Sequence, residues 1–433
     1  MVHHDSEIII VGAGAFGTST AYHLARRGFQ SVRVFDPYPP PSCEAAATDI
    51  SKVIRSDYAY PLYARLGLES IEAWQSWDMF QGLYHKPGWM LSAFDLSVPF
   101  VERSVKVSKS VGDHGIEVVT TDDIKRRVPQ ISGRLDGWNF NVWNPNAGWA
   151  NADKALEKMA LAAQAAGVEY ISGEAGHVDK IMYRSGRCRG VVTRDGMMHE
   201  AELVVLAAGA WSPSLVDLED QLVAKGHAVA HIQLSPEETQ FYADMPIMDS
   251  LELGYFFPPQ ENGIFKMAHS QFITNTQKVP QLGISTSVPH TFVMAPSDDL
   301  PVDVESTMRR NLARVFPELS QRPFCFTRLC WDADTADRHF LIAPHPKTSG
   351  LFLACAGSAH GFKFLPVLGK YIVDAIEGKL DPATMQSWRW RAGEKFEAKS
   401  LAHMDPELEL WGLSGWKNRR TNRLSEAEIR SHL

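Results

Sequence analysis

The first forty residues alternate between apolar and polar segments in an order that predicts a strand, a helix and a second strand. Residues 7–11 form an almost continuous apolar run, which is typical of a strand buried on both faces. A glycine loop follows, and the segment 18–27 then has the pattern of a helix that ends at Gly28 as its C-cap. Residues 32–35 are a second apolar run, which ends at Asp36. This order predicts the βαβ unit that opens a parallel sheet.

The apolar pattern leaves this rhythm after residue 60 and returns to it later. Residues 60–145 are rich in aromatic and charged side chains and show no βαβ order. Further elements expected from the pattern are a helix over 152–166, strands over 168–171 and 203–206, a hairpin that turns at Asp195-Gly196, alternating strands over 254–257 and 264–267, a strand over 351–354 and a helix after Pro366.

These elements predict an α/β protein whose first domain is interrupted. The predicted segments are a Rossmann-like nucleotide-binding domain from 1–60, 146–220 and 326–385, a substrate domain with a mixed β-sheet from 61–145 and 221–325, and a C-terminal tail from 386–433.

The glycine loop has the chemistry of a dinucleotide site. Gly12 permits the tight turn, Gly14 lets a pyrophosphate approach the backbone, and Gly17 lets the helix pack closely on the strand. The helix N-terminus offers free N–H groups to the phosphates. Asp36 can accept hydrogen bonds from the ribose hydroxyls, which disfavours a 2′-phosphate. Strand, loop, helix, strand and acid together predict a bound dinucleotide.

Composition excludes some other classes of protein. The chain has 433 residues with 45% hydrophobic residues, which suits two domains with substantial cores. The net charge of −8 and the lack of a sustained basic block argue against a nucleic-acid surface. Five cysteines without metal-type spacing indicate a reducing compartment, and we expect no metal site. We expect neither a signal peptide nor a membrane span.

The chain ends in Ser431-His432-Leu433, which is similar to the Ser-Lys-Leu address that the peroxisomal import receptor reads. We therefore predict a peroxisomal protein. The alternative is a chance ending on a cytoplasmic protein.

Several motifs resemble one family of flavoenzymes. They are the glycine loop with the Thr18-Ser-Thr-Ala-Tyr-His helix, the Asp36-Pro-Tyr-Pro turn, Arg328-Leu-Cys330-Trp331, and Gly361-Phe362-Lys363. They resemble the monomeric sarcosine oxidase group, which includes pipecolate and saccharopine oxidases and the fungal fructosyl amino acid oxidases, or amadoriases. The similarity covers nearly the whole chain and is densest over 7–58, 146–212 and 326–378.

The resemblance implies a Rossmann-like FAD-binding domain of the DAO and glutathione reductase type. The residues that it implies for FAD binding are Gly12, Ala13, Gly14, Phe16, Gly17, Asp36, Lys52, Val178, Gly209, Trp211, Cys330, Gly361, Phe362 and Lys363. Cys330 matches the cysteine that carries FAD covalently in this family, and a thiolate is a competent nucleophile for such a bond. The alternatives are that Cys330 is only a buried apolar residue, or that Cys355 is the attachment site.

Two lysines match catalytic lysines of the family. Lys363 matches the lysine beside the substrate carboxylate and the flavin, and Lys266 matches the lysine on the flavin face where oxygen reacts. From the residues alone, each could also be an ordinary surface lysine. His339, His360 and Tyr58 are candidate neighbours of the pocket, although a structural role for the histidines is equally consistent with the sequence.

Two positions discriminate between branches of the family. Sarcosine-type members carry an arginine at the position of Arg55, where its planar fork binds the substrate carboxylate, whereas fructosyl oxidases have a small residue there. Fructosyl oxidases also have an acidic residue at the position of Ser270. Both differences point away from a fructosyl substrate. A solvent-exposed Arg55 is the alternative.

We therefore predict an FAD-dependent oxidase of a secondary amine with an α-carboxylate, such as an N-alkyl amino acid, saccharopine, pipecolate or sarcosine. Such an enzyme oxidises the C–N bond to an imine and reduces O₂ to hydrogen peroxide. One alternative is a fructosyl amino acid oxidase. Alternatives from other classes are a flavin dehydrogenase with a protein acceptor and a silent flavin-binding protein. We expect a monomer with no nucleic-acid or membrane partner.

Overall fold

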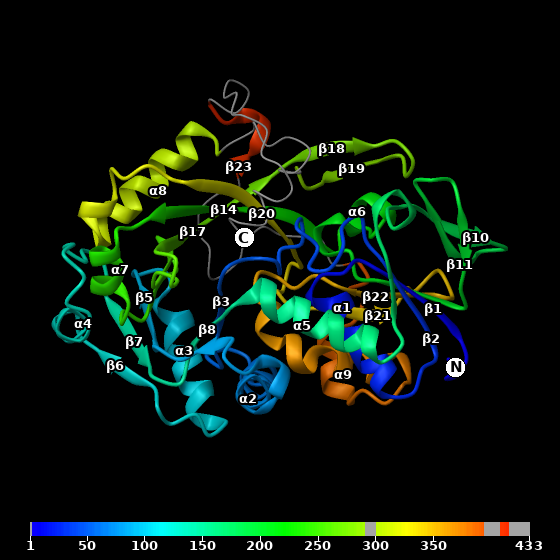
Figure 1. Cartoon of the computed structure of the whole chain (residues 1–433), viewed down its shortest axis with the longest axis horizontal. Helices are drawn as coiled ribbons and strands as arrows, with labels where there is room; N and C mark the ends of the chain where they lie inside the picture. Colours follow the sequence, from blue (N-terminus) through cyan, green and yellow to red (C-terminus); the bar gives the residue numbers. More distant parts are fainter. Residues whose placement is uncertain (1, 291–299, 394–407, 415–433) are drawn as a thin grey trace.

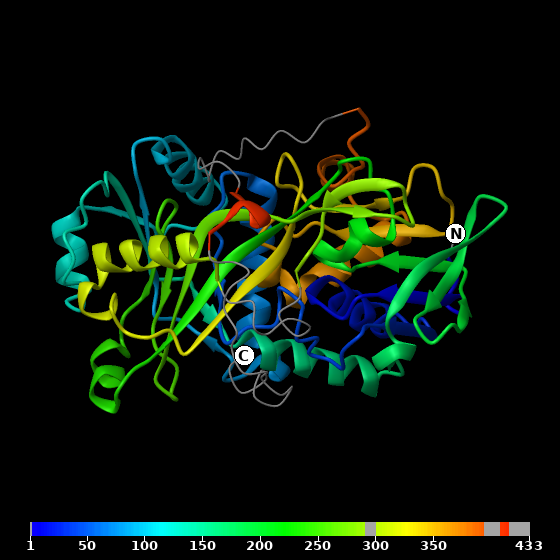
Figure 2. The same ribbon diagram turned by 90° about the horizontal axis from the view of Figure 1, so that it is seen from above.

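The structure is a computed structural model that describes residues 2–290, 300–393 and 408–414. The described residues form two large sheets, which lie on the right and on the left in Figures 1 and 2. The smaller sheet has six strands in the order β21-β22-β13-β1-β2-β9. Its strands are β1 (Glu7–Val11), β2 (Ser31–Phe35), β9 (Glu169–Ile171), β13 (Leu203–Leu206), β22 (Leu351–Cys355) and β21 (Leu341–Pro344). All neighbours are parallel except β21, which is antiparallel to β22.

The strands of this sheet are apolar because both faces are covered. Ile8, Ile10 and Val205 pack in one core cluster with the helices α1 (Ala15–Arg26) and α9 (Leu365–Ile376). Ile9 and Val204 pack on the other face against the three-stranded sheet of β10 (Val178–Arg184), β11 (Arg187–Thr193) and β12 (Met198–Glu200). The result is a three-layer nucleotide-binding fold.

Close helix packing stabilises the helical layer. Helix α1 lies against both α9 and α5 (Ala152–Ala165), below the sheet in Figure 1. A Cβ atom at Gly369 of α9 would lie only 2.0 Å from the Ser19 carbonyl oxygen of α1. Glycine is therefore required at this crossing.

The larger sheet has nine strands within the described residues, in the order β20-β14-β17-β16-β15-β5-β7-β6, with β23 paired to β17. These strands are β20 (Phe326–Asp334), β14 (Val223–Gln233), β17 (Ile264–Thr274), β16 (Gly254–Phe257), β15 (Ile247–Ser250), β5 (Trp89–Ala93), β7 (Phe140–Asn144), β6 (Glu117–Val119) and β23 (Leu408–Glu409). The sheet is mixed, because β15 is parallel to β5 and antiparallel to β16.

One face of the larger sheet is a hydrophobic core. Met248, Phe256 and Met267 on three of its strands pack in the same cluster as Met308 and Leu312 of α8 (Val302–Val315). Helix α8 lies above the long strands in Figure 1. The opposite face carries the residues of the candidate site.

Smaller elements connect these layers. They are β3 (Lys52–Ile54), β8 (Gly148–Ala150) and β4 (Tyr84–His85), which form a small sheet, the hairpin β18 (Thr276–Val279) and β19 (Ile284–Ser287), and the helices α2 (Pro61–Ser76), α3 (Val98–Ser110), α4 (Thr121–Arg127), α6 (Ser212–Leu215), α7 (Pro236–Tyr242) and α10 (Pro382–Ser387). Within the described ranges, no helix is long and apolar enough to cross a membrane.

The predicted fold class and the opening βαβ unit are confirmed, but two placements differ. Strand β20 hydrogen-bonds to β14 of the larger sheet, so the chain returns to the nucleotide-binding sheet only at β21 and not at residue 326, where the predicted segment begins. The segment 386–393, predicted as part of a tail, contains Trp388 and Arg391, whose exposed fractions are 0% and 2%. This part of the tail is therefore packed into the protein. The domain boundaries themselves stay a prediction.

Candidate active site

A cavity of about 480 Å³ opens where β1, β2 and β13 end. The carboxyl ends of parallel strands are the usual place for a nucleotide in such a sheet. The predicted site residues that line it are Gly12, Gly14, Phe16, Asp36, Lys52, Val178, Gly209, Trp211, Gly361 and Phe362. The structure therefore brings together four distant parts of the chain around one cavity.

The glycines of the first loop meet different requirements. Gly12 has φ +106°, and a Cβ atom there would lie 2.6 Å from the Ala207 carbonyl oxygen. A Cβ atom at Gly17 would lie 1.9 Å from the Gly12 carbonyl oxygen. A Cβ atom at Gly14 would meet only the Ala45 Cβ, at 3.6 Å, so this glycine is not required by packing within the protein. Gly14 instead lines the cavity. Helix α1 begins here without a side-chain cap, which leaves its first amides available to an anion.

Asp36 at the end of β2 orders the loop and also lines the cavity. Its carboxylate accepts hydrogen bonds from the Ala13 amide at 2.8 Å, the Tyr38 amide at 2.9 Å and the Ser42 hydroxyl at 2.7 Å. Burial raises its pKa above the usual value. A carboxylate has about four acceptor positions, so one is left for a ligand hydroxyl. Ala13 and Gly17 lie behind the loop and do not line the cavity.

The opposite wall is a loop in an unusual backbone conformation. Ala356, Ser358 and Ala359 have φ values of +61°, +47° and +59°. Such strained backbone concentrates at ligand-binding sites. A Cβ atom at Gly361 would lie 2.8 Å from the Phe16 ring, so the loop packs directly on the first turn of α1.

The polar face of the larger sheet points toward this cavity region. Paired residues in a sheet project to the same side. Asp249 pairs with Tyr255, and Phe257 pairs with Lys266. Lys266 pairs with His231, which in turn pairs with Phe326, and Cys330 lies four residues further along the same face of β20. Asp249, Lys266 and Cys330 therefore share one face, although they come from three strands.

Cys330 lies among cations. It is buried, and its Sγ atom lies 3.8 Å from Lys52 Nζ and 3.6 Å from Arg328 Nη2. Positive charges stabilise a thiolate, which is the nucleophilic form. Burial alone would lower the pKa of Lys52, but Cys330 and Asp49 raise it above the usual value. Cys355 is fully buried in the apolar core, where burial raises the pKa of its thiol to about 12.

Lys266 is held by a buried carboxylate. Its Nζ atom donates to Asp49 Oδ2 and to the Ser51 carbonyl oxygen, both at 2.6 Å. Lys52 Nζ lies 3.1 Å from the same Asp49 oxygen. Burial lowers the pKa of Lys266 to about 8, against the opposing effect of Asp49. Lys266 is thus a cation that titrates near physiological pH.

Lys363 is a buried lysine beside an aromatic cluster. Its Nζ atom donates to the His360 carbonyl oxygen at 3.0 Å and lies 5.6 Å from the Tyr58 ring. Burial, and then Arg55, lower its pKa well below the usual value. Tyr58 also contacts the His360 ring, with 3.3 Å between the hydroxyl and Nδ1. Tyr58 and His360 therefore do lie beside Lys363.

Arg55 is held between two aromatic rings. Its Cζ atom lies 4.6 Å from the Tyr58 ring centre and 4.8 Å from the Trp89 ring centre, and it donates to the Asp57 carbonyl oxygen. Arg55 is only partly exposed, which excludes the fully exposed alternative. Ser270 is buried, and its hydroxyl donates to the Glu252 carbonyl oxygen at 2.8 Å.

These observations fit an FAD: a cavity at the strand ends, an uncapped helix N-terminus, a glycine that leaves space for a ligand, and a thiol among cations. The DAO family, described as FAD dependent oxidoreductase, matches residues 7–375. This chain belongs to that family. It is an FAD-dependent oxidoreductase whose glycine loop, Asp36 and Gly361 line the site where the cofactor would bind.

Known members similar to this chain fall into the branches considered above. L-saccharopine oxidase of Schizosaccharomyces pombe is 33% identical over 410 residues, which cover 90% of this chain and 94% of the relative. Monomeric sarcosine oxidase of Bacillus sp. is 24% identical over a stretch that covers 87% of this chain and 93% of the relative. The solved structure of fructosamine oxidase (Amadoriase II) from Aspergillus fumigatus has a TM-score of 0.90 at 32% identity, covering 99% of this chain and all of that one.

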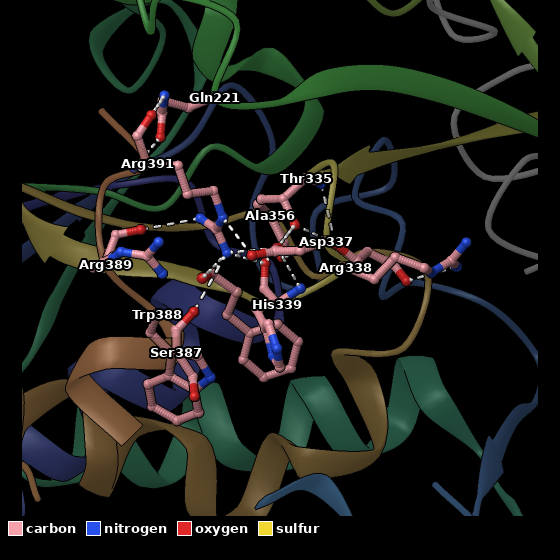
Figure 3. Close-up of polar contacts among 12 residues, drawn as sticks. Gln221, Thr335, Asp337, Arg338, His339, Ala356, Ser387, Trp388, Arg389 and Arg391 are labelled. Atoms are coloured by element: carbon pink, nitrogen blue, oxygen red, sulfur yellow. Dashed lines mark hydrogen bonds and ion pairs between the residues drawn. The ribbon is translucent and has the colours of Figure 1, made fainter. Parts of the chain in front are cut away.

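Figure 3 shows how the C-terminal segment holds the loop 335–340 beside the site. Arg391 donates to Asp337 Oδ2 at 2.9 Å and to the His339 carbonyl oxygen at 3.1 Å, and its backbone is held by the Gln221 side chain. His339 Nδ1 lies 3.2 Å from the Tyr63 hydroxyl. In this structure His339 supports the aromatic cluster through Tyr63.

Sequence reasoning missed Asp49 and Asp249. Asp49 is 1% exposed and joins Lys52 and Lys266, but nothing near it in the sequence indicates a partner 217 positions away. Asp249 is an acidic residue within β15, whose residues are all buried. An acidic residue within a buried strand is the sequence signal that could have identified it. Among the described residues, no group of three or more His, Cys, Asp or Glu side chains could hold a metal.

Proposed function

We propose that this protein is an FAD-dependent oxidase of secondary amines that carry an α-carboxylate. The observation that carries the proposal is the placement of Arg55, whose guanidinium lies between the rings of Tyr58 and Trp89. A preorganised, partly desolvated guanidinium beside a buried lysine is a strong binding site for a carboxylate. The names of the relatives, saccharopine oxidase and sarcosine oxidase, agree with such substrates.

The residues have distinct roles in this proposal. Arg55 and Lys363 bind the carboxylate and so orient the carbon next to the nitrogen. Bound FAD would supply the oxidising chemistry: it would take a hydride equivalent from that carbon and pass the two electrons to O₂, giving hydrogen peroxide. Lys266 supplies a positive charge where negative charge develops on oxygen. The substrate leaves as an imine, which water hydrolyses.

The flavin bond is part of the proposal. Cys330 is the proposed attachment site, because Lys52 and Arg328 lie beside its sulfur while Cys355 lies in an apolar core. Lys52, whose Nζ atom lies 3.8 Å from the Cys330 sulfur, also lines the cavity, and this supports Cys330 as the attachment site.

A fructosyl amino acid oxidase is the second candidate. The similarity to solved fructosyl oxidases supports it. Arg55 and Ser270 argue against it, because an arginine and a hydroxyl stand where that branch has a small and an acidic residue.

The deciding experiment is peroxide release in air by the purified protein, measured with sarcosine, pipecolate, saccharopine, proline, fructosyl-glycine and fructosyl-lysine. We expect turnover of secondary amines without a sugar group. Turnover confined to the fructosyl compounds would overturn the substrate assignment. Reduction of a dye without peroxide would indicate a dehydrogenase, and no flavin bleaching by any amine would indicate a silent protein.

We also propose that the enzyme is a monomer imported into peroxisomes through Ser431-His432-Leu433, which lie outside the described residues. The names of two relatives, both peroxisomal sarcosine oxidases, agree with this location. A fluorescent protein fused before the last twelve residues should enter peroxisomes, and removal of Leu433 should leave it in the cytosol. A cytosolic fusion with the intact ending would contradict the assignment.

A further inference from the structure

One buried carboxylate near Arg55 has no role in the proposed reaction. Asp249 on β15 is 1% exposed, and its side chain interacts with the Trp89 side chain, but its Oδ1 atom has no hydrogen-bond partner among the described residues. Buried carboxylates are normally paired or hydrogen-bonded, so such an atom needs an explanation. The location of Asp249 offers an explanation, because Arg55 and Lys363, the two residues assigned to substrate binding, are among its electrostatic neighbours.

The strand pairing fixes the direction of this side chain. Asp249 pairs with Tyr255 on one side and with Leu91 on the other. Leu91 and Trp89 lie two residues apart on β5 and therefore share a face. Arg55 stacks on that same Trp89 ring. Asp249, Trp89 and Arg55 are consequently neighbours on the polar face of the sheet.

Asp249 is not a direct ion-pair partner of Arg55. The guanidinium of Arg55 is engaged with the Tyr58 and Trp89 rings and the Asp57 carbonyl oxygen. Within the described part of the chain, no ion pair or hydrogen bond joins the Asp249 side chain to Arg55 or Lys363. Burial raises the pKa of Asp249 to about 7, because the positive charge of Arg55 offsets the effect of burial only in part. A bound cation would keep it ionised.

We infer that Asp249 binds an ammonium group of the substrate that is separate from the nitrogen being oxidised. The inference rests on the proposed function, since it places this ammonium in the same pocket as the carboxylate held by Arg55. A carboxylate paired with the reacting amine would hold a proton on it, whereas that amine must be neutral when its neighbouring C–H bond is oxidised. Asp249 therefore suits a nitrogen that stays charged.

The substrate class follows from the charges. Arg55 and Lys363 suit carboxylates, and Asp249 suits a primary ammonium. The substrate is then an amino acid derivative with a secondary amine, at least one carboxylate next to it, and a second, protonated amine. Small substrates such as sarcosine and pipecolate lack this last group.

A matched pair of substrates tests the inference. Saccharopine carries the second ammonium, and N-(5-carboxypentyl)glutamate is the same molecule without it. In Asp249→Asn we expect KM for saccharopine to rise at least about tenfold and KM for the analogue to stay within about twofold. The control variant Asp244→Asn, at an exposed carboxylate three residues before the same strand, should change neither value.

Other outcomes overturn the inference. An equal rise in KM for both substrates would indicate that Asp249 acts at the reacting amine. An unchanged KM for both would mean that Asp249 does not bind the substrate. If the wild-type protein oxidises neither compound but oxidises sarcosine or pipecolate, the inference fails and the proposed function stands. If it oxidises no secondary amine with an α-carboxylate, the proposed function itself fails. Loss of saccharopine binding by Asp249→Asn is also measured by the rise in Tm on adding saccharopine under anaerobic conditions. A wild-type-sized rise in Tm for the variant would contradict the inference.

Discussion

At the residue scale, the main feature is a buried group of charges around Asp49. Lys266 and Lys52 lie 2.6 Å and 3.1 Å from its carboxylate, and Lys52 also contacts Cys330. The cations lower the pKa of Asp49, against the effect of burial, so it stays ionised. The group therefore carries excess positive charge beside a thiol and beside the proposed oxygen site.

The pKa of Lys266, lowered to about 8, predicts a pH dependence. The ammonium is present below pH 8 and is lost as pH rises, so the rate constant for flavin reoxidation by O₂ should fall through about pH 8. The negative charge of Asp49 keeps the pKa of Lys266 from falling further. In Asp49→Asn this pKa should therefore be lower, and the reoxidation rate constant should begin to fall at lower pH. Lys266→Met should slow reoxidation about a hundredfold.

Stopped-flow reoxidation measures these rates, with Lys278→Met on the exposed face of β18 as the control. That control should keep the wild-type profile. A wild-type rate that is constant across pH 8 would contradict the role of Lys266.

The cations around Cys330 predict where the flavin is attached. Cys330→Ala should yield protein from which acid precipitation releases FAD, whereas the wild type should keep it in the pellet. Cys325→Ala, at an exposed cysteine, should behave as the wild type. Flavin retained in the pellet by Cys330→Ala would show that another residue carries it.

At the element scale, the segment 386–393 and the loop 335–340 stabilise each other. Arg391 and Asp337 form an ion pair at 2.8 Å, with side-chain exposed fractions of 2% and 32%. The loop in turn contacts the left-handed cofactor loop, since Arg338 donates to the Ser358 carbonyl oxygen at 3.1 Å. A change in the C-terminal segment should therefore reach the cofactor site.

Arg391→Met should lower the free energy of unfolding by about 2–3 kcal/mol, because Asp337 and four carbonyl groups lose their buried donor. Thermal unfolding of the flavin-loaded protein measures this as a drop in Tm of several degrees. Lys347→Met, which removes the exposed ion pair with Glu219, should change stability by less than about 1 kcal/mol. Equal effects of the two substitutions would contradict the structural role of Arg391.

Elements were predictable where their signals are local. The strand over 7–11, the helix over 152–166 and the hairpin at Asp195-Gly196 were confirmed as β1, α5 and the β11–β12 turn. Helix α1 begins at Ala15 rather than at residue 18, because Gly14 serves as its N-cap without any polar side chain to mark the start. The order of strands in the larger sheet was not predictable, because it joins β5 to β15 across about 150 residues.

At the scale of the whole molecule, the site depends on two sheets that are interleaved in the sequence. The glycine loop belongs to the smaller sheet, while Lys266 and Cys330 belong to the larger one. The cavity-lining glycines of the first loop and Asp36 could be predicted from the sequence, because a nucleotide loop is a contiguous motif. Asp49 and Asp249 could not be predicted in this way, because their neighbours come from strands and loops that are distant in the sequence.

Flavin absorbance during anaerobic mixing shows directly whether the substrate carboxylate is required. The flavin-loaded protein is mixed with saccharopine, pipecolate or sarcosine, and with the corresponding amides. We expect bleaching by at least one carboxylate-bearing secondary amine, no bleaching by its amide, and a loss of about a hundredfold in apparent affinity in Arg55→Gln. Bleaching by amide and carboxylate alike, or by fructosyl compounds alone, would contradict this expectation.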